Sequence, residues 1–509
     1  MLTWVSATSR VLHKQSLMPS AMPQSASAPP DPLPMLIGDA WHASNATLDS
    51  INPANGVLNH RVAAATAAEV DRAVLAATAA AAAPAWRDLL PHRRAALLHA
   101  IGAAIDARAE SFARLQMLDN GKVWSECVAQ AKSAAATFRY YAAVCETIGS
   151  ELTPPRGDYL SMSVHEPYGV VAAITPWNSP LTMEAQKVAP ALAAGNAVIL
   201  KPSEFTPSAA LELGRVALAA GLPPGLLNVL PGTGAAAGTA LVVHPGVKMV
   251  SFTGGTASGR RIAEAAAKKL MPVSLELGGK SPHIVFADAN LDAAVPAVAA
   301  GIFEGSGQSC VAGSRLFVQR SVLAKVLAAL REIARTLRVD LPDAPEAQMG
   351  PMASFAHRER VAAMVDAARR EGADIVCGGT PPAAPALRDG AFYLPTLVAG
   401  INNRATIAQQ EIFGPVLCVL PFDDEDDLIA QANDSAYGLA AGVWSGDVKR
   451  AWRVAGRLQA GTVWINTYKQ LSIATPFGGY KMSGLGREKG IGGLRLYQQT
   501  KGIYLGLDA

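Results

Sequence analysis

A single cysteine, Cys310, lies among small and polar residues in the segment EGSGQSCVAGSR, residues 304–315. A cysteine that packs as a small apolar residue usually has apolar neighbours. Here Gly305, Gly307 and Gly313 leave the backbone bare enough for another molecule to approach the sulfur closely. Taken alone, the segment leaves two interpretations open: Cys310 is a nucleophile, or it is a structural cysteine that lies in a loop.

The other four cysteines fit the structural interpretation. Cys127 and Cys145 lie in helical patterns, and Cys377 and Cys418 lie in the apolar runs ADIVC and VLCVLPF. The chain has five cysteines, an odd number, and no CxxC pair, which argues against a disulfide framework and against a structural zinc site. We therefore expect no metal, and a reducing compartment, the cytoplasm.

Acidic residues in two further glycine-rich segments could also do chemistry. Glu276, in SLELGGKSP, follows an apolar strand and lies between two leucines, so we expect it to be half buried with a raised pKa. A carboxyl with a raised pKa suits a general base, although an ion pair is the alternative. Glu411 precedes Phe413, Gly414 and Pro415 in QQEIFGPV.

The elements that must position these residues alternate along the chain between β-branched apolar runs and helical patterns. This spacing predicts βαβ units and a doubly wound parallel sheet, so the fold class is α/β. Such sheets bind ligands at the carboxyl ends of their strands. The predicted strands are 169–175, 196–202, 226–232 and 248–254, and the helices between them are 181–194, 208–220 and 234–243.

Helical patterns precede this region and a second α/β region follows Cys310. A capping box at Thr66–Glu69 opens the first helix, and residues 150–167 form a hairpin or a linker. The later strands are RLFVQ, DIVCGG, YGLAAGVWS and GTVWINT. Further helices are predicted at 93–118, 126–148, 321–338, 354–371 and 448–458.

Polar residues follow the strands of the first region. Asn178 comes after the first strand, in TPWNSP, and Lys201 and Glu204 come after the second, in KPSE. Gly254 and Gly259, in TGGTASG, open a helix whose free N–H groups could hold a phosphate. The run PGTGAAAG nearly matches a dinucleotide fingerprint, but a packing turn is at least as good an interpretation.

The length, charge and composition of the chain argue against several classes of function. A chain of 509 residues suggests two or three domains, and the net charge of +3 is scattered with no basic run among aromatics, so nucleic acid is not expected. The longest uncharged stretch, 216–247, contains prolines and glycines that exclude a continuous membrane helix. Residues 1–34 are rich in Ser, Ala and Pro; a disordered extension fits them better than a mitochondrial transit peptide.

Seven motifs, in order, make the chain resemble the NAD(P)-dependent aldehyde dehydrogenase superfamily, in its hydrolytic, non-acylating branch. They are TPWNSP, KPSE, FTGGTASG, LELGGKSP, GQSCVAGSR, EIFGPV and PFGGYKMSGLGREKG, and the resemblance runs from about residue 38 onward. The resemblance implies a Rossmann-like NAD-binding domain (35–149 and 168–277), an α/β catalytic domain (278–482) and a small β bridging or oligomerisation element (150–167 and 483–509). It also implies a dimer or a tetramer.

The resemblance further implies site roles. Cys310 is the catalytic thiolate, Glu276 the general base and Asn178 an oxyanion donor, with Lys187 also catalytic. An aldehyde bound to Cys310 would lose hydride, and Glu276 would activate the water that hydrolyses the thioester. The bare glycines around Cys310 would then let cofactor and substrate both reach the sulfur. The expected cofactor is NAD, with NADP weaker, held by Ile174, Thr175, Pro176, Trp177, Lys201, Ser203, Glu204, Gly254, Gly255, Gly259, Leu277, Glu411 and Phe413.

The expected substrate pocket departs from the family pattern. Ser179, Gln186 and Leu471 stand where aromatic residues are common, so we expect a wide pocket and a bulky or polar-substituted aldehyde. The remaining pocket residues are Met183, Val311 and Phe477. Two alternatives remain: an enzyme that transfers the acyl group to coenzyme A, although such enzymes generally lack the glutamate at Glu276, and a non-catalytic binding protein that keeps the fold.

Overall fold

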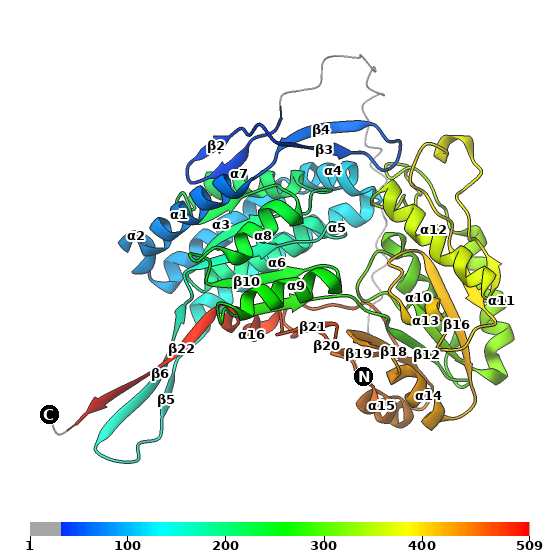
Figure 1. Cartoon of the computed structure of the whole chain (residues 1–509). Coiled ribbons are helices and arrows are strands. Elements are labelled where there is room, and N and C mark those ends of the chain that lie inside the picture. The colour runs from blue at the N-terminus through cyan, green and yellow to red at the C-terminus, as the bar shows by residue number, and fades with distance from the viewer. Residues whose placement is uncertain (1–31, 508–509) are drawn as a thin grey trace, which may run out of the picture.

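The computed structural model describes residues 32–507, so the expected disordered extension falls almost entirely outside the described residues. Two α/β bodies lie side by side, and a long β-arm projects away from both (Figure 1). Within residues 32–507, no helix combines the length and the apolar character that crossing a membrane requires.

The first body is built on an eight-stranded sheet whose central five strands are parallel. β7, β8 and β10 are buried along their whole length, because helices cover both faces of the sheet, and this explains their continuous apolar sequences. In spatial order the strands are β2 (Ala40–His42), β1 (Met35–Ile37), β9 (Leu227–Val229), β8 (Ala197–Lys201), β7 (Val170–Ile174), β10 (Met249–Thr253), β11 (Val273–Glu276) and β21 (Gly484–Leu485).

The helices of the first body follow the predicted pattern with one break. The predicted capping box is present, with Thr66 and Glu69 satisfying each other's backbone N–H groups. The single helix expected at 93–118 is two helices, because the backbone leaves helical geometry at Arg108. The helices are α1 (Ala67–Ala82), α2 (Pro84–Arg87), α3 (Pro91–Ala107), α4 (Ala109–Asn120), α5 (Trp124–Thr147), α6 (Pro180–Ala193), α7 (Ser208–Ala219), α8 (Thr239–Val243), α9 (Thr256–Ala267) and α16 (Gly490–Arg495).

The glycine-rich run PGTGAAAG is a packing turn. Residues Gly234–Gly238 form one π-helical turn before α8. A β-carbon on Gly232 would come within 2.7 Å of the Ala237 side chain. The glycine is therefore required for close packing of the turn on its own strand end.

The second body contains a seven-stranded sheet that is parallel except for one edge. The segment YGLAAGVWS, expected as one strand, splits between two sheets: β17 (Tyr437–Gly438) pairs with β20 (Tyr480–Lys481), and the rest joins the main sheet. The main strands are β14 (Asp374–Cys377), β15 (Thr396–Ala399), β16 (Val416–Phe422), β13 (Arg315–Gln319), β12 (Pro282–Val285), β18 (Ala440–Trp444) and β19 (Thr462–Ile465). The helices are α10 (Leu291–Phe303), α11 (Leu323–Thr336), α12 (Phe355–Arg370), α13 (Thr406–Gln409), α14 (Glu425–Asn433) and α15 (Val448–Arg457).

The β-arm consists of three antiparallel strands: β5 (Glu151–Thr153), β6 (Tyr159–Pro167) and β22 (Gln498–Gly506). The hairpin expected at 150–167 therefore exists, and it pairs with a strand near the other end of the described chain. Residues 484–485, which the sequence-based division placed in the bridging element, pair instead with β11 of the first sheet. A separate hairpin, β3 (Thr47–Ile51) and β4 (Leu58–Ala63), lies across the first body (Figure 1).

Candidate active site

The carboxyl ends of β7, β10 and β11 open into a cleft of about 1490 Å³ that residues of both bodies line. The predicted site residues in this lining come from every expected class, catalytic, cofactor-binding and substrate-binding. They are Pro176, Trp177, Asn178, Ser179, Met183, Gln186, Gly254, Gly255, Glu276, Leu277, Cys310, Val311, Glu411, Phe413, Leu471 and Phe477.

Seven predicted residues do not line this cleft: Ile174, Thr175, Lys187, Lys201, Ser203, Glu204 and Gly259. Lys201 and Glu204 form an ion pair at 3.7 Å at the end of β8. Gly259 lies in α9 where a β-carbon would come within 2.4 Å of Leu277, so it permits α9 to pack closely on the end of β11.

The loop that carries Cys310 is shaped by glycines that contact protein. Gly305 and Gly307 have φ of 64° and 70°, and Ser306 between them has φ of 57°. A β-carbon on Gly307 would lie 2.1 Å from the Gly414 carbonyl oxygen. The expectation that these glycines give ligands access to the sulfur is therefore wrong for Gly307; it lets two backbone segments pack against each other.

Cys310 itself is half-buried at the cleft. Burial raises the pKa of its thiol to about 12, and the carboxyl groups of Glu276 and Glu411 act in the same direction. The Lys489 ammonium and the backbone N–H of Val311 oppose them. In this arrangement the sulfur holds its proton at neutral pH, so a nearby group must accept that proton before the sulfur attacks.

Glu276 ends β11 and is almost fully buried, which is more than the half burial expected from its two leucine neighbours. Among residues 32–507, neither carboxyl oxygen has a hydrogen-bond partner. Burial raises its pKa well above the usual range, the Glu488 carboxylate adds to the shift, and Lys187 opposes it. Such a carboxyl can take a proton at a pH where an ordinary glutamate is already ionised.

A buried network lies behind Glu276. Lys187 Nζ donates to Glu488 Oε1 at 2.5 Å and to Ser251 Oγ at 3.1 Å. Gln186 Nε2 donates to the other oxygen of Glu488. Lys187 therefore positions the Glu488 carboxylate and does not line the cleft itself, which differs from the catalytic role expected for it.

Asn178 lies two residues before α6, on the loop that follows β7. Its Nδ2 donates to the backbone carbonyl of Gln308 at 2.9 Å. This bond holds the side-chain amide against the loop that carries Cys310.

The other half of the cleft offers groups suited to a nucleotide. Gly255 immediately precedes α9 and provides no side-chain cap, and the first turn of α9 contains no acidic residue. Glu411 Oε1 accepts a hydrogen bond from the Gly279 backbone at 2.9 Å, and burial raises its pKa to about 7. Trp177 packs edge-on against Phe413, with ring centroids 5.2 Å apart.

The polar residues of the expected substrate pocket form hydrogen bonds with other side chains of the protein. Ser179 Oγ accepts a hydrogen bond from Gln130 Nε2 at 3.3 Å, and the amide of Gln186 donates to Glu488. Both side chains therefore have a hydrogen-bond partner within the protein, and neither needs a polar substrate for one, which removes one reason for expecting a polar-substituted aldehyde. Leu471 is half exposed at the edge of the cleft, and Phe477 packs with Val311, Trp464 and Tyr468.

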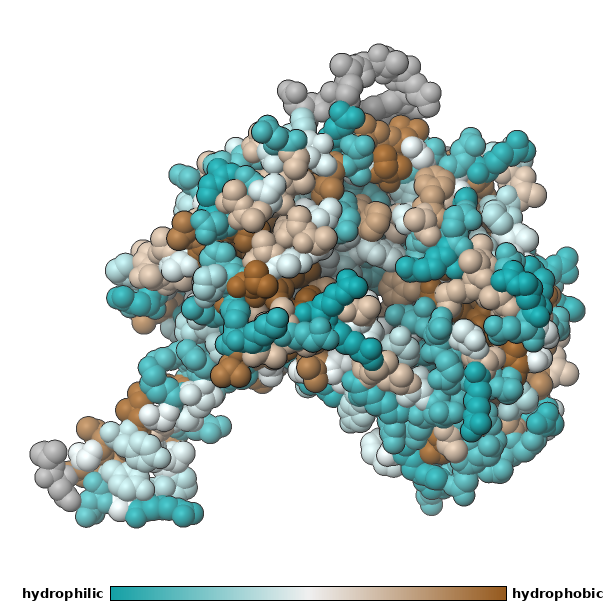
Figure 2. Space-filling view, in the orientation of Figure 1, coloured by the Kyte–Doolittle hydropathy of each residue, from teal (hydrophilic) through white to brown (hydrophobic). Residues whose placement is uncertain are grey.

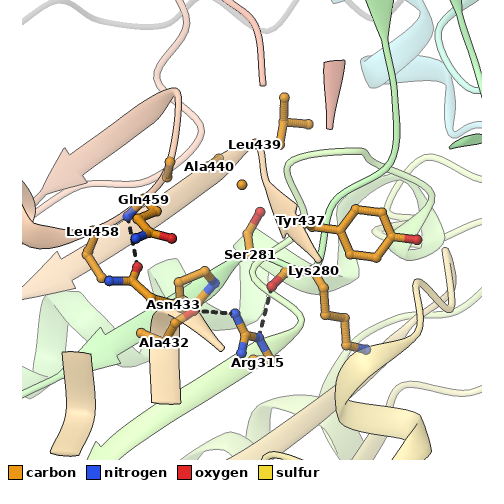
Figure 3. Close-up of a pocket in the computed structure, with 13 residues that line it drawn as sticks. Lys280, Ser281, Arg315, Ala432, Asn433, Tyr437, Leu439, Ala440, Leu458 and Gln459 are labelled. Carbon is orange, nitrogen blue, oxygen red and sulfur yellow. Dashed lines mark hydrogen bonds between the residues drawn. The ribbon is translucent and has the colours of Figure 1, made fainter. Parts of the chain in front are cut away.

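A second pocket, about 10 Å³ and large enough for one water molecule, lies under the loop after Glu276 (Figure 3). Arg315, which is fully buried, donates to the carbonyls of Lys280 at 2.9 Å and Ala432 at 2.7 Å. The arginine, which lies in β13, thus ties the loop that follows Glu276 to α14. Within residues 32–507 no group of three or more His, Cys, Asp or Glu could hold a metal ion.

The chain has many relatives of known class. The model of the aldehyde dehydrogenase family matches residues 41–503. The chain is 43% identical to a betaine aldehyde dehydrogenase of Cereibacter sphaeroides (91% of this chain, 95% of the relative). It is 42% identical to a 2-hydroxymuconic semialdehyde dehydrogenase of Pseudomonas sp. strain CF600 (91% and 96%).

A solved structure agrees with the sequence relatives. Betaine aldehyde dehydrogenase of Staphylococcus aureus, in complex with NAD+, has a TM-score of 0.92 and 38% identity, covering 94% of this chain and 95% of that one. The chain belongs to the aldehyde dehydrogenase family, and it has the fold and the cleft of an aldehyde dehydrogenase.

Gln130, Lys469, Glu488 and Lys489 are among the cleft residues that sequence reasoning missed. Gln130 and Lys469 lie in segments with no motif. Glu488 and Lys489 lie within the motif PFGGYKMSGLGREKG, so charged residues in that motif could have been flagged. The contact between Gln186 and Glu488 joins residues 302 positions apart, which no local pattern predicts.

Proposed function

We propose that this enzyme oxidises an aldehyde to the carboxylic acid with NAD, through a covalent intermediate on Cys310. The observation that carries the proposal is the arrangement of Cys310, Glu276 and Asn178 around one cleft. Ser179 stands where an aromatic residue is common in the family, and its smaller side chain leaves room for a bulky or substituted aldehyde.

The residues present fit a dinucleotide. The uncapped start of α9 offers backbone N–H groups to a diphosphate. Glu204, more than a third exposed, can accept hydrogen bonds from a ribose diol, and its carboxylate disfavours a 2′-phosphate, so we propose NAD in preference to NADP. Glu411 suits a second ribose. When bound, the cofactor supplies the acceptor for hydride.

In the first half-reaction, a sulfur–carbon bond forms between Cys310 and the carbonyl carbon while the thiol proton passes to a cleft base. Asn178 Nδ2 releases its hydrogen bond to the Gln308 carbonyl and donates instead to the oxyanion that forms on the substrate. The Cys310 backbone N–H is the second donor to this oxyanion. One such donor contributes about 3 kcal/mol to stabilising the transition state.

In the second half-reaction, Glu276 removes a proton from the water that attacks the thioester. The raised pKa of Glu276 suits this role. Lys187 and Glu488 form an ion pair next to Glu276, and their charges shift the pKa of Glu276 in opposite directions. We therefore propose them as positioning residues that act through Glu276.

Transfer of the acyl group to coenzyme A is the first alternative, and the unpartnered Glu276 in the cleft argues against it because hydrolysis needs such a base. A non-catalytic protein is the second, and the retained Cys310, Glu276 and Asn178 argue against it. We also propose self-association through the β-arm, as a dimer or a tetramer, and a cytoplasmic enzyme; the five free cysteines support the latter.

The test is NADH formation from a panel of aldehydes, with and without coenzyme A, by the wild type and by Cys310→Ala. The variant should lose dehydrogenase activity and keep its NAD affinity, because the substitution removes only the sulfur. If Cys310→Ala kept even about a tenth of wild-type turnover, the covalent mechanism would be wrong.

A further inference from the structure

One cation of the cleft, Lys489, has no partner among the described residues. It immediately precedes α16 and lines the cleft with Cys310, Glu276 and Phe477. Within residues 32–507 its ammonium makes no hydrogen bond and no ion pair; it lies over the ring of Phe477, 5.1 Å from the centroid. Phe477 packs in the same apolar cluster as Cys310, so this ammonium lies beside the nucleophile.

The other cationic side chains of the cleft are engaged. Lys469 pairs with Glu304 at 3.8 Å, and Lys122 pairs with Glu126 at 3.3 Å. Arg360 contacts the ring of His357 at the cofactor end. Among the described residues, Lys489 is therefore the cleft cation beside Cys310 that has no ion pair, whereas Arg360 lies at the cofactor end.

The backbone at Lys489 supports a functional reason for the residue. Its φ of 63° and ψ of 175° fall in a region that is essentially restricted to glycine. A side chain with a β-carbon is strained there, and glycine would relieve the strain. A lysine in this conformation lowers the local stability relative to glycine. We therefore attribute its presence to a function of the side chain.

The position of Lys489 also bears on positively charged substrates. A quaternary ammonium is recognised by open aromatic faces. The Phe477 face beside Cys310 already carries the Lys489 ammonium. Ser179 and Leu471 provide no ring at their positions, so a cationic substrate at Cys310 would lie beside the Lys489 ammonium.

The negative groups nearby do not neutralise Lys489. Glu488 is paired with Lys187, and Glu276 holds its proton to a higher pH than an ordinary carboxyl. Burial lowers the pKa of the Lys489 ammonium, and a carboxylate bound against that ammonium would raise the pKa again, so this position favours an anion over a neutral group.

We propose that Lys489 selects an aldehyde that also bears a carboxylate, a semialdehyde, whose negative end pairs with the Lys489 ammonium while its carbonyl carbon lies at Cys310. This inference rests on the proposed aldehyde oxidation and names the substrate class within it.

The experiment compares three substrates of similar length: succinic semialdehyde, neutral pentanal and cationic betaine aldehyde. We expect the wild type to prefer succinic semialdehyde in kcat/KM, because a charge-assisted hydrogen bond corresponds to about 10- to 150-fold. Lys489→Gln should lose most of the preference for succinic semialdehyde over pentanal, mainly through a higher KM for the semialdehyde, whereas Lys489→Arg should retain the preference.

Two further variants separate this role from others. Lys489→Gly should raise the melting temperature while losing the preference, since glycine relieves the strain and removes the charge. Lys132→Gln, a matched change at an exposed lysine of α5, should leave the preference unchanged.

Several results would overturn the proposal. The wild type could oxidise pentanal as well as succinic semialdehyde, which would leave the aldehyde oxidation standing and remove the role of Lys489. Lys489→Gln could slow all three substrates equally and shift the pH profile of Cys310 alkylation, which would assign the ammonium to the thiol instead. If no aldehyde yields NADH, the proposed function fails first.

Discussion

Glu276 is a buried carboxyl without a hydrogen-bond partner in the described chain, and its raised pKa has a kinetic consequence. Glu276→Gln should release a burst of about one NADH per active site and then turn over slowly, because only thioester hydrolysis needs the base. Rapid mixing with absorbance detection measures the burst. Loss of the burst would show that Glu276 acts earlier, on the thiol.

The same variant should change the pH dependence. The folded-state pKa of Glu276 lies above its ordinary value, so the deprotonated base becomes available only as the pH rises. Steady-state turnover of the wild type should therefore increase with pH, and the residual turnover of Glu276→Gln should not.

Individual residues were predictable where a motif carried them. Cys310, Glu276 and Asn178 each follow a strand or a glycine-rich turn, and all three line the cleft. What local sequence could not reveal is how partners pair across the chain: the role of Lys187 depends on Glu488, 301 positions away.

At the scale of single elements, the start of α9 tests the proposed cofactor site. Gly255→Asp should raise the KM for NAD about tenfold or more, because a carboxylate at the helix start competes with the diphosphate for the same N–H groups. The melting temperature should not fall, since aspartate caps helices well.

Gly255→Ala is the matched control. A β-carbon at Gly255 meets no atom within 4 Å, and φ of −66° suits any residue. NAD affinity, measured by calorimetry, should be nearly unchanged. Equal effects of the two variants would show that space rather than charge governs the position.

Glu184 in α6 is fully buried, and neither of its carboxyl oxygens has a partner among the described residues. Burial raises its pKa well above 4.5, and Asp119 adds to the shift. The folded protein therefore keeps this proton after the unfolded chain has lost it, so stability falls as the pH rises above about 4.5.

Glu184→Gln should accordingly stabilise the protein at neutral pH, by about 1.4 kcal/mol for each unit by which burial raises the pKa of the carboxyl, since the amide does not ionise. The gain should shrink as the pH approaches 4.5. Thermal unfolding at the two pH values measures the difference, and a gain that is equal at both would contradict the assignment.

Helices and strands were predictable from the sequence where the hydrophobic period and the residue composition indicated the same type of element. The strands of the first sheet have continuous apolar sequences that reveal burial on both faces. The break at Arg108 carries no proline or glycine, and the division of YGLAAGVWS between two sheets depends on its neighbour β20. Both features are set by tertiary packing.

At the scale of the whole molecule, the β-arm carries exposed apolar side chains (Figure 2). Tyr504 and Leu505 are 71% and 56% exposed, although an isolated three-stranded sheet gains little from such exposure. If the arm mediates self-association, Leu505→Glu should shift the protein towards monomers in light scattering.

A matched control is Val448→Glu on α15, where the valine is comparably exposed. It should leave the assembly unchanged. A monomeric wild type, or an oligomer that tolerates Leu505→Glu, would show that the arm does not hold copies together.

The pairing of β6 with β22 has a consequence for biosynthesis. Thr500 lies 335 residues after its neighbour His165, and the rest of the first body and the whole second body are encoded between them. At about 5–20 residues per second, a ribosome needs roughly 17–67 s to supply the partner strand. During that time β6 has an open edge, and the nascent chain cannot present a finished arm to another copy. Completion of the arm is thereby delayed until both bodies have been synthesised, so contacts that need the whole arm form late.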